Sequence, residues 1–267
     1  MRDPQTPTAT TRLMTRREAL RCTTVTALAL ATGACGSSTE PSLPPSNTVN
    51  GRLNVRVTPP TQSTAPGLYE LGLGGVRDGF FYVPTSYRPA VAAPLAVLLH
   101  GAGQDATEMV DPIRPLADEV GLILVAPDSR SGTWDAIHGE YSVDADFIDE
   151  ALRFAFEQVR VDATRVRIAG FSDGGTYSLS LGLINGDFFS RIVAFSPGFV
   201  VGGSWHGKPK MFVTHGTRDV ILPIDQTSRV IVPALRGAGY DVEYHEFDGG
   251  HGVTQALLEQ SVDWLAA

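Results

Sequence analysis

A serine that could act as a nucleophile lies in the run Gly170-Phe171-Ser172-Asp173-Gly174, which matches the pattern G-x-S-x-G. The β-branched run at 165–169 before it predicts a strand, and apolar residues at helical spacing over 176–184 predict a helix after it. A sharp turn between a strand and a helix presents a serine at the positive end of the helix, and flanking glycines permit the strained backbone. The five residues alone also fit an ordinary Gly/Ser turn, so the hypothesis depends on the partners of Ser172.

A serine nucleophile needs a base, and for a serine on such a turn the acid and then the histidine follow it along the chain. His251 lies in the glycine-rich segment 248–252, just past the last predicted strand, and is the expected base. The other five histidines fit less well. His100 and His138 precede Ser172, and His206 lies before a predicted strand. His215 ends that strand, and His245 lies within the next one.

Asp219 follows the predicted strand at 210–214 and is the expected acid, because it would accept the imidazole N–H and fix the tautomer of the base. Two other aspartates compete with it. Asp225 begins a predicted helix, where capping is the simpler role, and Asp248 lies too close to His251 in the sequence.

Acyl transfer also needs hydrogen-bond donors for the developing oxyanion. One is expected to be the backbone N–H of Asp173, directly after the nucleophile. The second is expected in the glycine-rich segment 100–104, which follows the continuous apolar run at 95–99 and so a predicted buried strand. Ala102 is the first choice there and Gly103 the next, while His100 is expected to brace the loop.

These segments together resemble the α/β-hydrolases, and more narrowly the phospholipase/carboxylesterase and polyhydroxybutyrate-depolymerase-like (feruloyl-esterase-like) group. The matching segments run in order over about two-thirds of the chain: 99–104, 147–152, 161–166, 170–175, 215–219 and 250–252. The resemblance implies the fold and a serine mechanism, but no particular substrate. Asp173 departs from this group, which commonly has glutamine, alanine or asparagine after the nucleophile.

Alternating strands and helices from about residue 51 to 267 predict one α/β catalytic domain with a mostly parallel central sheet covered by helices on both faces. An alternating segment at 52–57 is expected to add an antiparallel edge strand. Only 196–210 separates two late strands, so no large cap domain is expected over the site. Trp134 is a candidate for the substrate pocket, with Trp205 a weaker one; packing is the alternative role for both.

The N-terminal segment 1–34 is expected to be a twin-arginine signal peptide, with Arg16 and Arg17 before a short, weakly apolar stretch. Cys35 follows Thr-Gly-Ala, which resembles a bacterial lipobox except that leucine is usual at Thr32. Lipidation of Cys35 is expected, with ordinary signal cleavage as the alternative. Residues 35–50 are rich in Ser, Thr and Pro and are expected to form a flexible tether. The protein is therefore expected at the periplasm or cell surface, or otherwise secreted.

The formal charge is −8, and removal of the signal would leave about −11, which disfavours nucleic acid as a partner. The sequence lacks HExxH, P-loop and dinucleotide-binding patterns, so neither metal nor cofactor is expected. The main hypothesis is an exported serine carboxylesterase. A serine peptidase or amidase, and a non-catalytic binding module on the same fold, are the alternatives. Natural substrate and oligomeric state cannot be predicted from the sequence.

Overall fold

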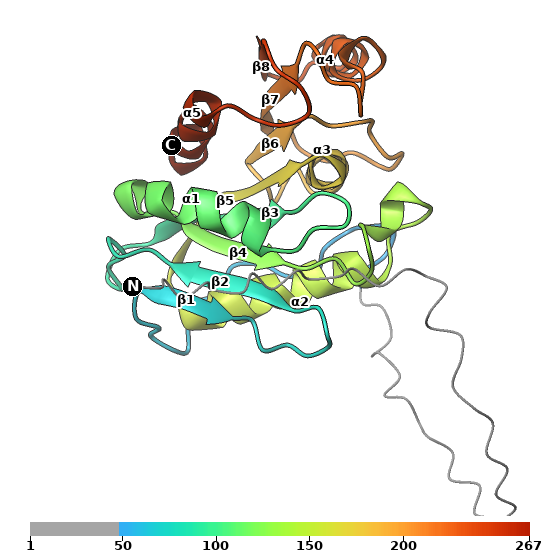
Figure 1. The fold of residues 1–267 in the computed structure, drawn as a ribbon. Coiled ribbons are helices and arrows are strands. Elements are labelled where there is room, and N and C mark those ends of the chain that lie inside the picture. The colour runs from blue at the N-terminus through green and yellow to red at the C-terminus, as the bar shows by residue number, and fades with distance from the viewer. Residues whose placement is uncertain (1–47) are drawn as a thin grey trace, which may run out of the picture. The chain divides into compact units, whose positions relative to one another are not determined.

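The computed structural model describes residues 48–267, and within them it forms an eight-stranded sheet in the order β1-β2-β4-β3-β5-β6-β7-β8. β2 pairs antiparallel with both β1 and β4, and every other pair is parallel. Figure 1 shows β1 at one edge and β8 at the other. The strands are β1 Gly67–Glu70, β2 Gly79–Val83, β3 Ala93–Leu99, β4 Ile123–Pro127, β5 Val161–Phe171, β6 Arg191–Phe195, β7 Lys210–Gly216 and β8 Val242–Phe247.

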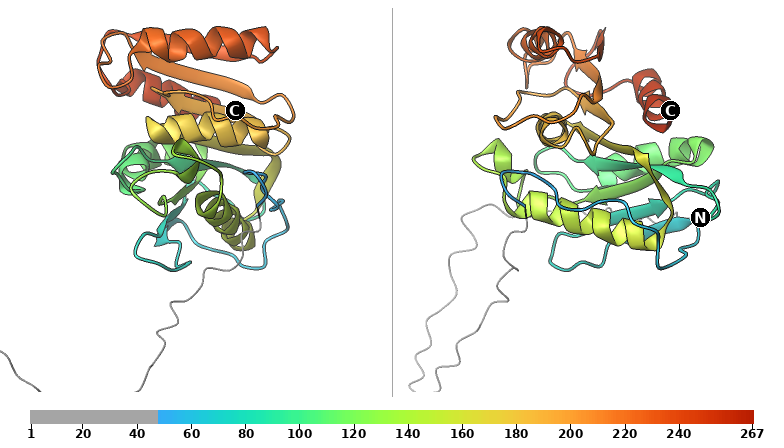
Figure 2. Two further views of the ribbon diagram at one scale, coloured as in Figure 1. Left: turned by 90° about the vertical axis from the view of Figure 1, so that its right-hand side faces the viewer. Right: turned by 180° about the vertical axis from the view of Figure 1, so that it is seen from behind.

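Five helices cover the two faces of this sheet, as Figures 1 and 2 show. Buried residues of α1 and α5 pack on one face, and those of α2, α3 and α4 pack on the other. The helices are α1 Thr107–Val120, α2 Val143–Gln158, α3 Asp173–Ile184, α4 Ser228–Gly237 and α5 Gln255–Ala266. The α/β-hydrolase fold class predicted from the sequence is confirmed. Among the described residues no helix is both long and apolar enough to cross a bilayer.

The central parallel strands β3, β4, β6 and β7 are buried on both faces, which explains their continuous apolar runs. Leu95 to Leu99 of β3 and Leu122 to Ala126 around β4 have no exposed surface. Alternate residues of each strand enter the two opposite cores. The predicted strands in this part of the chain are therefore confirmed to within a few residues.

One prediction about local structure was wrong, and one helix was not predicted. Residues 52–57 form no strand: the N–H of Leu53 donates to Asn185 Oδ1, and the N–H of Val55 donates to Asp149 Oδ1. Side chains thus take the place of a neighbouring strand, although Leu53 and Val55 are buried as the alternation indicated. Helix α1 was not predicted, because Pro112 and Pro115 lie inside it.

Parallel strands place their following loops at one edge of the sheet, where ligands bind in folds of this class. The segments after β3, β5, β7 and β8 meet there and carry the predicted site residues. The segment 196–209 between β6 and β7 contains no helix, so no large cap lies in this connection.

Candidate active site

Ser172 lies at the turn between β5 and α3 with φ 56° and ψ −117°, a conformation that non-glycine residues rarely adopt. Its N–H donates to the carbonyl oxygen of Phe195 on β6 at 2.9 Å, which holds the strained turn in place. A Cβ at Gly170 would lie 2.2 Å from the carbonyl oxygen of Gly174, so the turn requires glycine there. Strain that the surrounding structure maintains is a feature of functional sites.

The structure brings Ser172, His251 and Asp219 together in one chain of hydrogen bonds. His251 Nε2 lies 2.8 Å from Ser172 Oγ, and His251 Nδ1 lies 2.7 Å from Asp219 Oδ2. The carboxylate can only accept, so Nδ1 carries the proton and Nε2 is free to accept the serine proton. The ring of Phe171 lies 4.9 Å from the imidazole ring, measured between centroids, and supports its orientation. This geometry matches that of a nucleophile, its base and its acid.

The side chain of Asp219 is fully buried, and both carboxylate oxygens are hydrogen-bonded. Oδ1 accepts from the backbone N–H groups of Ile221 at 2.9 Å and Leu222 at 2.8 Å, while Oδ2 faces His251. Burial alone raises the pKa of Asp219, but the N–H of Leu222 and the contact with His251 outweigh it, so the pKa is lowered from its ordinary value. Asp219 therefore stays ionised opposite the imidazole.

The two competing aspartates lie elsewhere in ion pairs at the surface. Asp225 pairs with Arg229 at 2.7 Å, and Asp248 pairs with Arg218 at 2.7 Å. The side chain of Asp225 is 77% exposed and that of Asp248 is 79% exposed, whereas Asp219 is buried against the imidazole. The geometry thus favours Asp219 among the three.

Three backbone groups were predicted as oxyanion donors, and the structure separates them. Within residues 48–267 the N–H groups of Ala102 and Asp173 donate to no protein acceptor, so both are available to a ligand. The N–H of Gly103 instead donates to the carbonyl oxygen of Gly132 at 2.7 Å. Gly103 is therefore excluded as a donor in this conformation, because its backbone closes the loop.

His100 holds the loop that carries Ala102. Its Nδ1 lies 2.7 Å from the carbonyl oxygen of Gly101, and its Nε2 accepts from the N–H of Ser129 at 2.9 Å. Burial lowers the pKa of His100, so the ring is neutral with its proton on Nδ1. Arg77 joins the same loop by donating to the carbonyl oxygen of Gln104 at 2.7 Å. His100 has the bracing position that the sequence indicated.

Trp134 does not have the position predicted for it. It is fully buried, its indole N–H donates to the carbonyl oxygen of His100 at 2.8 Å, and its ring packs against Tyr177. With no exposed surface it cannot line a groove, so this prediction was wrong. Trp205 is 41% exposed but packs edge-on against Tyr240.

An apolar hollow that sequence reasoning missed is lined by residues next to Ser172 and His251 in the chain. It has a volume of about 310 Å³ and lies between the starts of α1 and α5. Phe171, next to the serine, and Gly252 and Val253, directly after His251, form part of its wall. The other lining residues are Gln104, Glu108, Met109, Pro112, Ile113, Phe195, Gln255 and Leu258. Because α1 was not predicted, no sequence signal could place these side chains beside Ser172.

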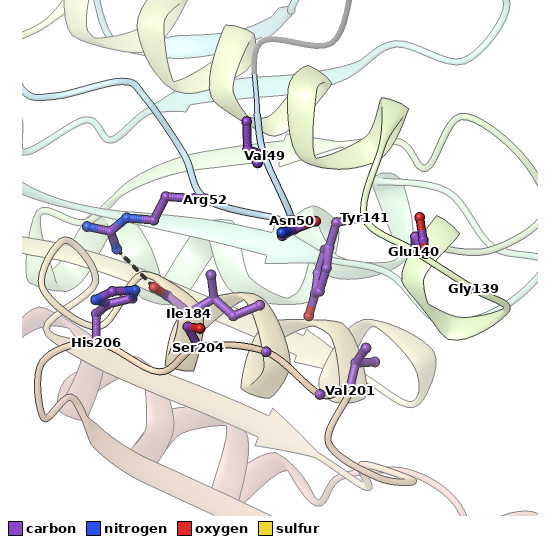
Figure 3. A pocket seen from close by; sticks show the side chains of 12 residues that line it. Val49, Asn50, Arg52, Gly139, Glu140, Tyr141, Ile184, Val201, Ser204 and His206 are labelled. Carbon is purple, nitrogen blue, oxygen red and sulfur yellow. Dashed lines mark hydrogen bonds between the residues drawn. The ribbon is translucent and has the colours of Figure 1, made fainter.

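A second hollow of about 540 Å³ is shown in Figure 3 and is remote from the serine along α3. Its wall includes Ile184, at the end of α3, whereas Ser172 precedes the first residue of that helix. The guanidinium of Arg52 donates to the carbonyl oxygen of Ile184 at 2.9 Å and pairs with Asp187. None of the three candidate catalytic residues lines this hollow.

Comparison with known proteins finds similarity to esterases and related hydrolases. The family model described as Phospholipase/Carboxylesterase matches residues 137–267. The chain is 32% identical over 168 residues to the bifunctional acetylxylan esterase/xylanase XynS20E of Neocallimastix patriciarum, covering 59% of this chain and 24% of that protein. It is 26% identical over 208 residues to a protein of Aspergillus oryzae named "Probable feruloyl esterase C", covering 66% of this chain and 76% of that one. A poly(3-hydroxybutyrate) depolymerase of Ralstonia pickettii is 30% identical over 139 residues, covering 45% and 28%. The chain thus spans only about a quarter of two of these three relatives.

Solved structures share the fold at lower identity. The structure of esterase PE8 superposes with a TM-score of 0.57 at 23% identity, covering 69% of this chain and 95% of that one. The serine hydrolase FphF of Staphylococcus aureus gives 0.59 at 17% identity, covering 76% and 100%. The strand order, the serine turn and these similarities agree: the chain has the α/β-hydrolase fold, and its residues 137–267 match the phospholipase/carboxylesterase family.

Proposed function

We propose that this chain is a serine carboxylesterase that forms an acyl-enzyme on Ser172. The observation that carries the proposal is the continuous hydrogen-bond chain from Ser172 Oγ through His251 to the buried Asp219, at 2.8 and 2.7 Å. Near it are two backbone N–H groups, those of Ala102 and Asp173, that donate to no protein acceptor within residues 48–267. A nucleophile, a base, an orienting acid and oxyanion donors together are what acyl transfer requires.

In the proposed mechanism each step involves a named atom. His251 Nε2 takes the proton of Ser172 Oγ as that oxygen attacks the ester carbonyl carbon. The carbonyl oxygen gains negative charge and accepts hydrogen bonds from Ala102 and Asp173, each worth about 3–4 kcal/mol in the transition state. The imidazolium then protonates the leaving alcohol. Water attacks the acyl-enzyme with help from the same nitrogen, and the acid departs.

The surroundings of Ser172 support esters with an apolar substituent as substrates. The apolar hollow beside Phe171 and Val253 can take such a group, and the short 196–209 connection leaves the opposite side without a helical cap. The names of the relatives mention acetylxylan, feruloyl and poly(3-hydroxybutyrate) substrates, which share only the carboxylic ester. The proposal therefore stops at accessible carboxylic esters.

Labelling with a fluorophosphonate tests the proposal directly. The wild type should gain one adduct on Ser172 by intact and peptide mass, and Ser172→Ala should gain none. Ser172→Ala should keep its fold and lose on the order of 10⁶ in kcat on a short-chain nitrophenyl ester. Ser204→Ala, which changes an exposed serine, is the matched control and should behave as wild type.

The outcomes separate the alternatives. Faster turnover of matched amides than of esters would make the chain a peptidase or amidase. Absence of both labelling and turnover in a folded wild type would make it a binding module. Activity of Ser172→Ala within tenfold of wild type would refute Ser172 as the nucleophile.

We further propose that residues 1–34 direct export through the twin-arginine route and that Cys35 carries lipid at the periplasmic or outer cell surface. Both features lie outside the described residues, and the support is the sequence pattern around Arg16, Arg17 and Cys35. Cys35→Ser should release the protein from membranes or block its processing, because serine lacks the thiol that would carry the lipid. Firm anchoring needs two or more acyl chains, and the variant would have none on this residue. Arg16→Lys with Arg17→Lys should leave the precursor in the cytoplasm. An unmodified Cys35 in the intact mass of the membrane fraction would refute the lipid anchor.

A further inference from the structure

A second histidine lies directly behind the acid of the site. His215, near the end of β7, has no exposed surface. Its Nε2 lies 2.7 Å from the carbonyl oxygen of Leu222 and 3.2 Å from Asp219 Oδ2. Its Nδ1 lies 2.7 Å from Ser228 Oγ at the start of α4. Both ring nitrogens therefore have partners, and two of the three partners belong to the turn that begins at Asp219.

These contacts fix the tautomer of His215. The carbonyl oxygen of Leu222 can only accept, so Nε2 carries the proton and Nδ1 accepts from the hydroxyl of Ser228. Burial lowers the pKa of His215, which keeps this ring neutral. The N–H thus donates to the carbonyl oxygen of Leu222, while Asp219 Oδ2 lies 3.2 Å from the same nitrogen as a close polar contact.

Leu222 links His215 to the second carboxylate oxygen as well. Its N–H donates to Asp219 Oδ1 at 2.8 Å, while its carbonyl accepts from His215. The imidazole is therefore linked to Asp219 Oδ1 by two hydrogen bonds through the peptide of Leu222, and it also lies 3.2 Å from Oδ2. Rotation of the Asp219 carboxylate would disturb both arrangements.

We propose that His215 is a positioning residue, which aims Asp219 Oδ2 at His251 by holding the peptide of Leu222, whose N–H donates to Asp219 Oδ1, and by packing against the same carboxylate. This inference rests on the proposed function, since it concerns how the acid of that site is oriented. His215 touches neither the ester nor Ser172, so it acts only through Asp219. Displacement of a catalytic group by about 1 Å can cost on the order of 10² in rate.

Other titratable groups around His215 contribute to any pH dependence. Asp219 and His251 face it from the site, and Glu246 is its register partner on the neighbouring strand β8. Glu246 is itself held by Arg229 and by the hydroxyl of Tyr244. The variants below leave all five groups in place.

Two isosteric substitutions separate positioning from filling of space. Glutamine at 215 puts an amide N–H where Nε2 lies, whereas asparagine puts one only where Nδ1 lies. His215→Gln should retain kcat within about fivefold, while His215→Asn and His215→Ala should lose on the order of 10² in kcat with little change in KM. His245→Gln, on β8 and facing the opposite core, is the control and should match wild type.

The pH profile of kcat/KM on a nitrophenyl ester is the readout that a structural role would not move. In His215→Asn and His215→Ala, the Asp219 carboxylate no longer aims well at the imidazolium of His251. The acidic limb of the profile should therefore shift to lower pH in these two variants. In His215→Gln the acidic limb should not move. The thermal midpoint of each variant excludes unfolding. Equal losses in the Gln and Asn variants, or an unmoved acidic limb in the Asn variant, would overturn the proposal. A wild type without esterase activity would instead refute the function itself.

Discussion

Thr133 Oγ1 donates a hydrogen bond to Asp173 Oδ2 at 2.7 Å, so the carboxylate that follows the nucleophile is held by the loop after β4. The N–H of the same aspartate is free to face an oxyanion. In the proposed reaction, the backbone N–H of Asp173 would stabilise the negative charge of the transition state, whereas its carboxylate would destabilise that charge. The threonine fixes the direction of the charge without removing it.

Asp173→Asn should therefore raise kcat/KM on a neutral ester. The amide keeps the backbone N–H and an acceptor for Thr133 but removes the negative charge, which is worth about 1–4 kcal/mol at a separation of ~4 Å. The expected gain is on the order of tenfold at low salt and smaller at high salt, because salt screens the charge. Asp241→Asn, at the opposite edge of the sheet, is the control. A slower Asp173→Asn enzyme would show that the carboxylate assists the reaction.

Asp219→Asn should cost on the order of 10⁴ in kcat, the precedent for a misoriented imidazole tautomer. The amide N–H₂ would face the Nδ1 proton of His251 and drive the ring to the other tautomer. Asp225→Asn removes only a surface pair with Arg229 and should change kcat by less than twofold. Steady-state kinetics of both variants, with Asp248→Asn as a third, show which aspartate orients His251. A larger loss of kcat in Asp225→Asn or Asp248→Asn than in Asp219→Asn would contradict the assignment of Asp219.

The predictions for Ser172 and His251 came from the order of segments along the chain and from local residue types, and the geometry of the structure agrees with them. The turn at Ser172 follows from glycines within a few residues of it, and His251 follows from its place after the last strand. Neither depends on packing between distant segments. The same holds for the parallel strands, whose apolar runs report burial on both faces.

Packing between distant segments decided what the sequence could not show. Helix α1 contains two prolines, yet burial of Met109, Val110 and Ile113 outweighs the missing N–H bonds. The direction of Trp134 was equally unpredictable, because either side of its loop can hold an indole and only the carbonyl of His100 selects the inward one. The contacts of His215 with Leu222 and Ser228 are of this long-range kind too.

Val253 should control which esters fit the apolar hollow. It is partly exposed and lies in the hollow wall two residues after His251. Val253→Phe should raise KM for hexanoate esters more than for acetate esters, and Val253→Ala should do the reverse. Val230, exposed on α4, gives matched control variants. Equal changes for both ester lengths would mean that the substrate lies elsewhere.

Asp144 should give the folded state a distinct pH dependence. Burial raises its pKa to about 6, although the N–H groups of Arg130 and Asp135 donate to it. Between about pH 4 and 6 the folded state keeps a proton that the unfolded chain has lost, so this group lowers stability as pH rises through that window. The loss is about 3 kcal/mol at most. Urea unfolding of wild type and Asp144→Asn from pH 4 to 7 checks this. The free energy of unfolding of the variant, relative to that of the wild type, should be higher at pH 7 than at pH 4. A difference that does not change with pH would contradict the raised pKa.

Gly174, like Gly170, should tolerate no side chain. A Cβ there would lie 2.1 Å from the carbonyl oxygen of Leu99 and 2.5 Å from that of His100, so α3 starts in direct contact with the end of β3. Alanine would push the serine turn away from the loop that carries Ala102, and backbone cannot yield as a flexible side chain can. Gly174→Ala should therefore lose about 1–3 kcal/mol of stability or more, together with most activity.

The matched control is Gly202→Ala, where nothing lies within 4 Å of the added Cβ and the stability should change little. Thermal unfolding and ester turnover are measured on both variants. Full activity in Gly174→Ala would mean that the oxyanion donors do not need the close contact between α3 and β3. A stable but inactive Gly174→Ala would instead show that this contact serves the alignment of Ser172 with Ala102 more than the fold, because only the spacing between the two segments would have changed.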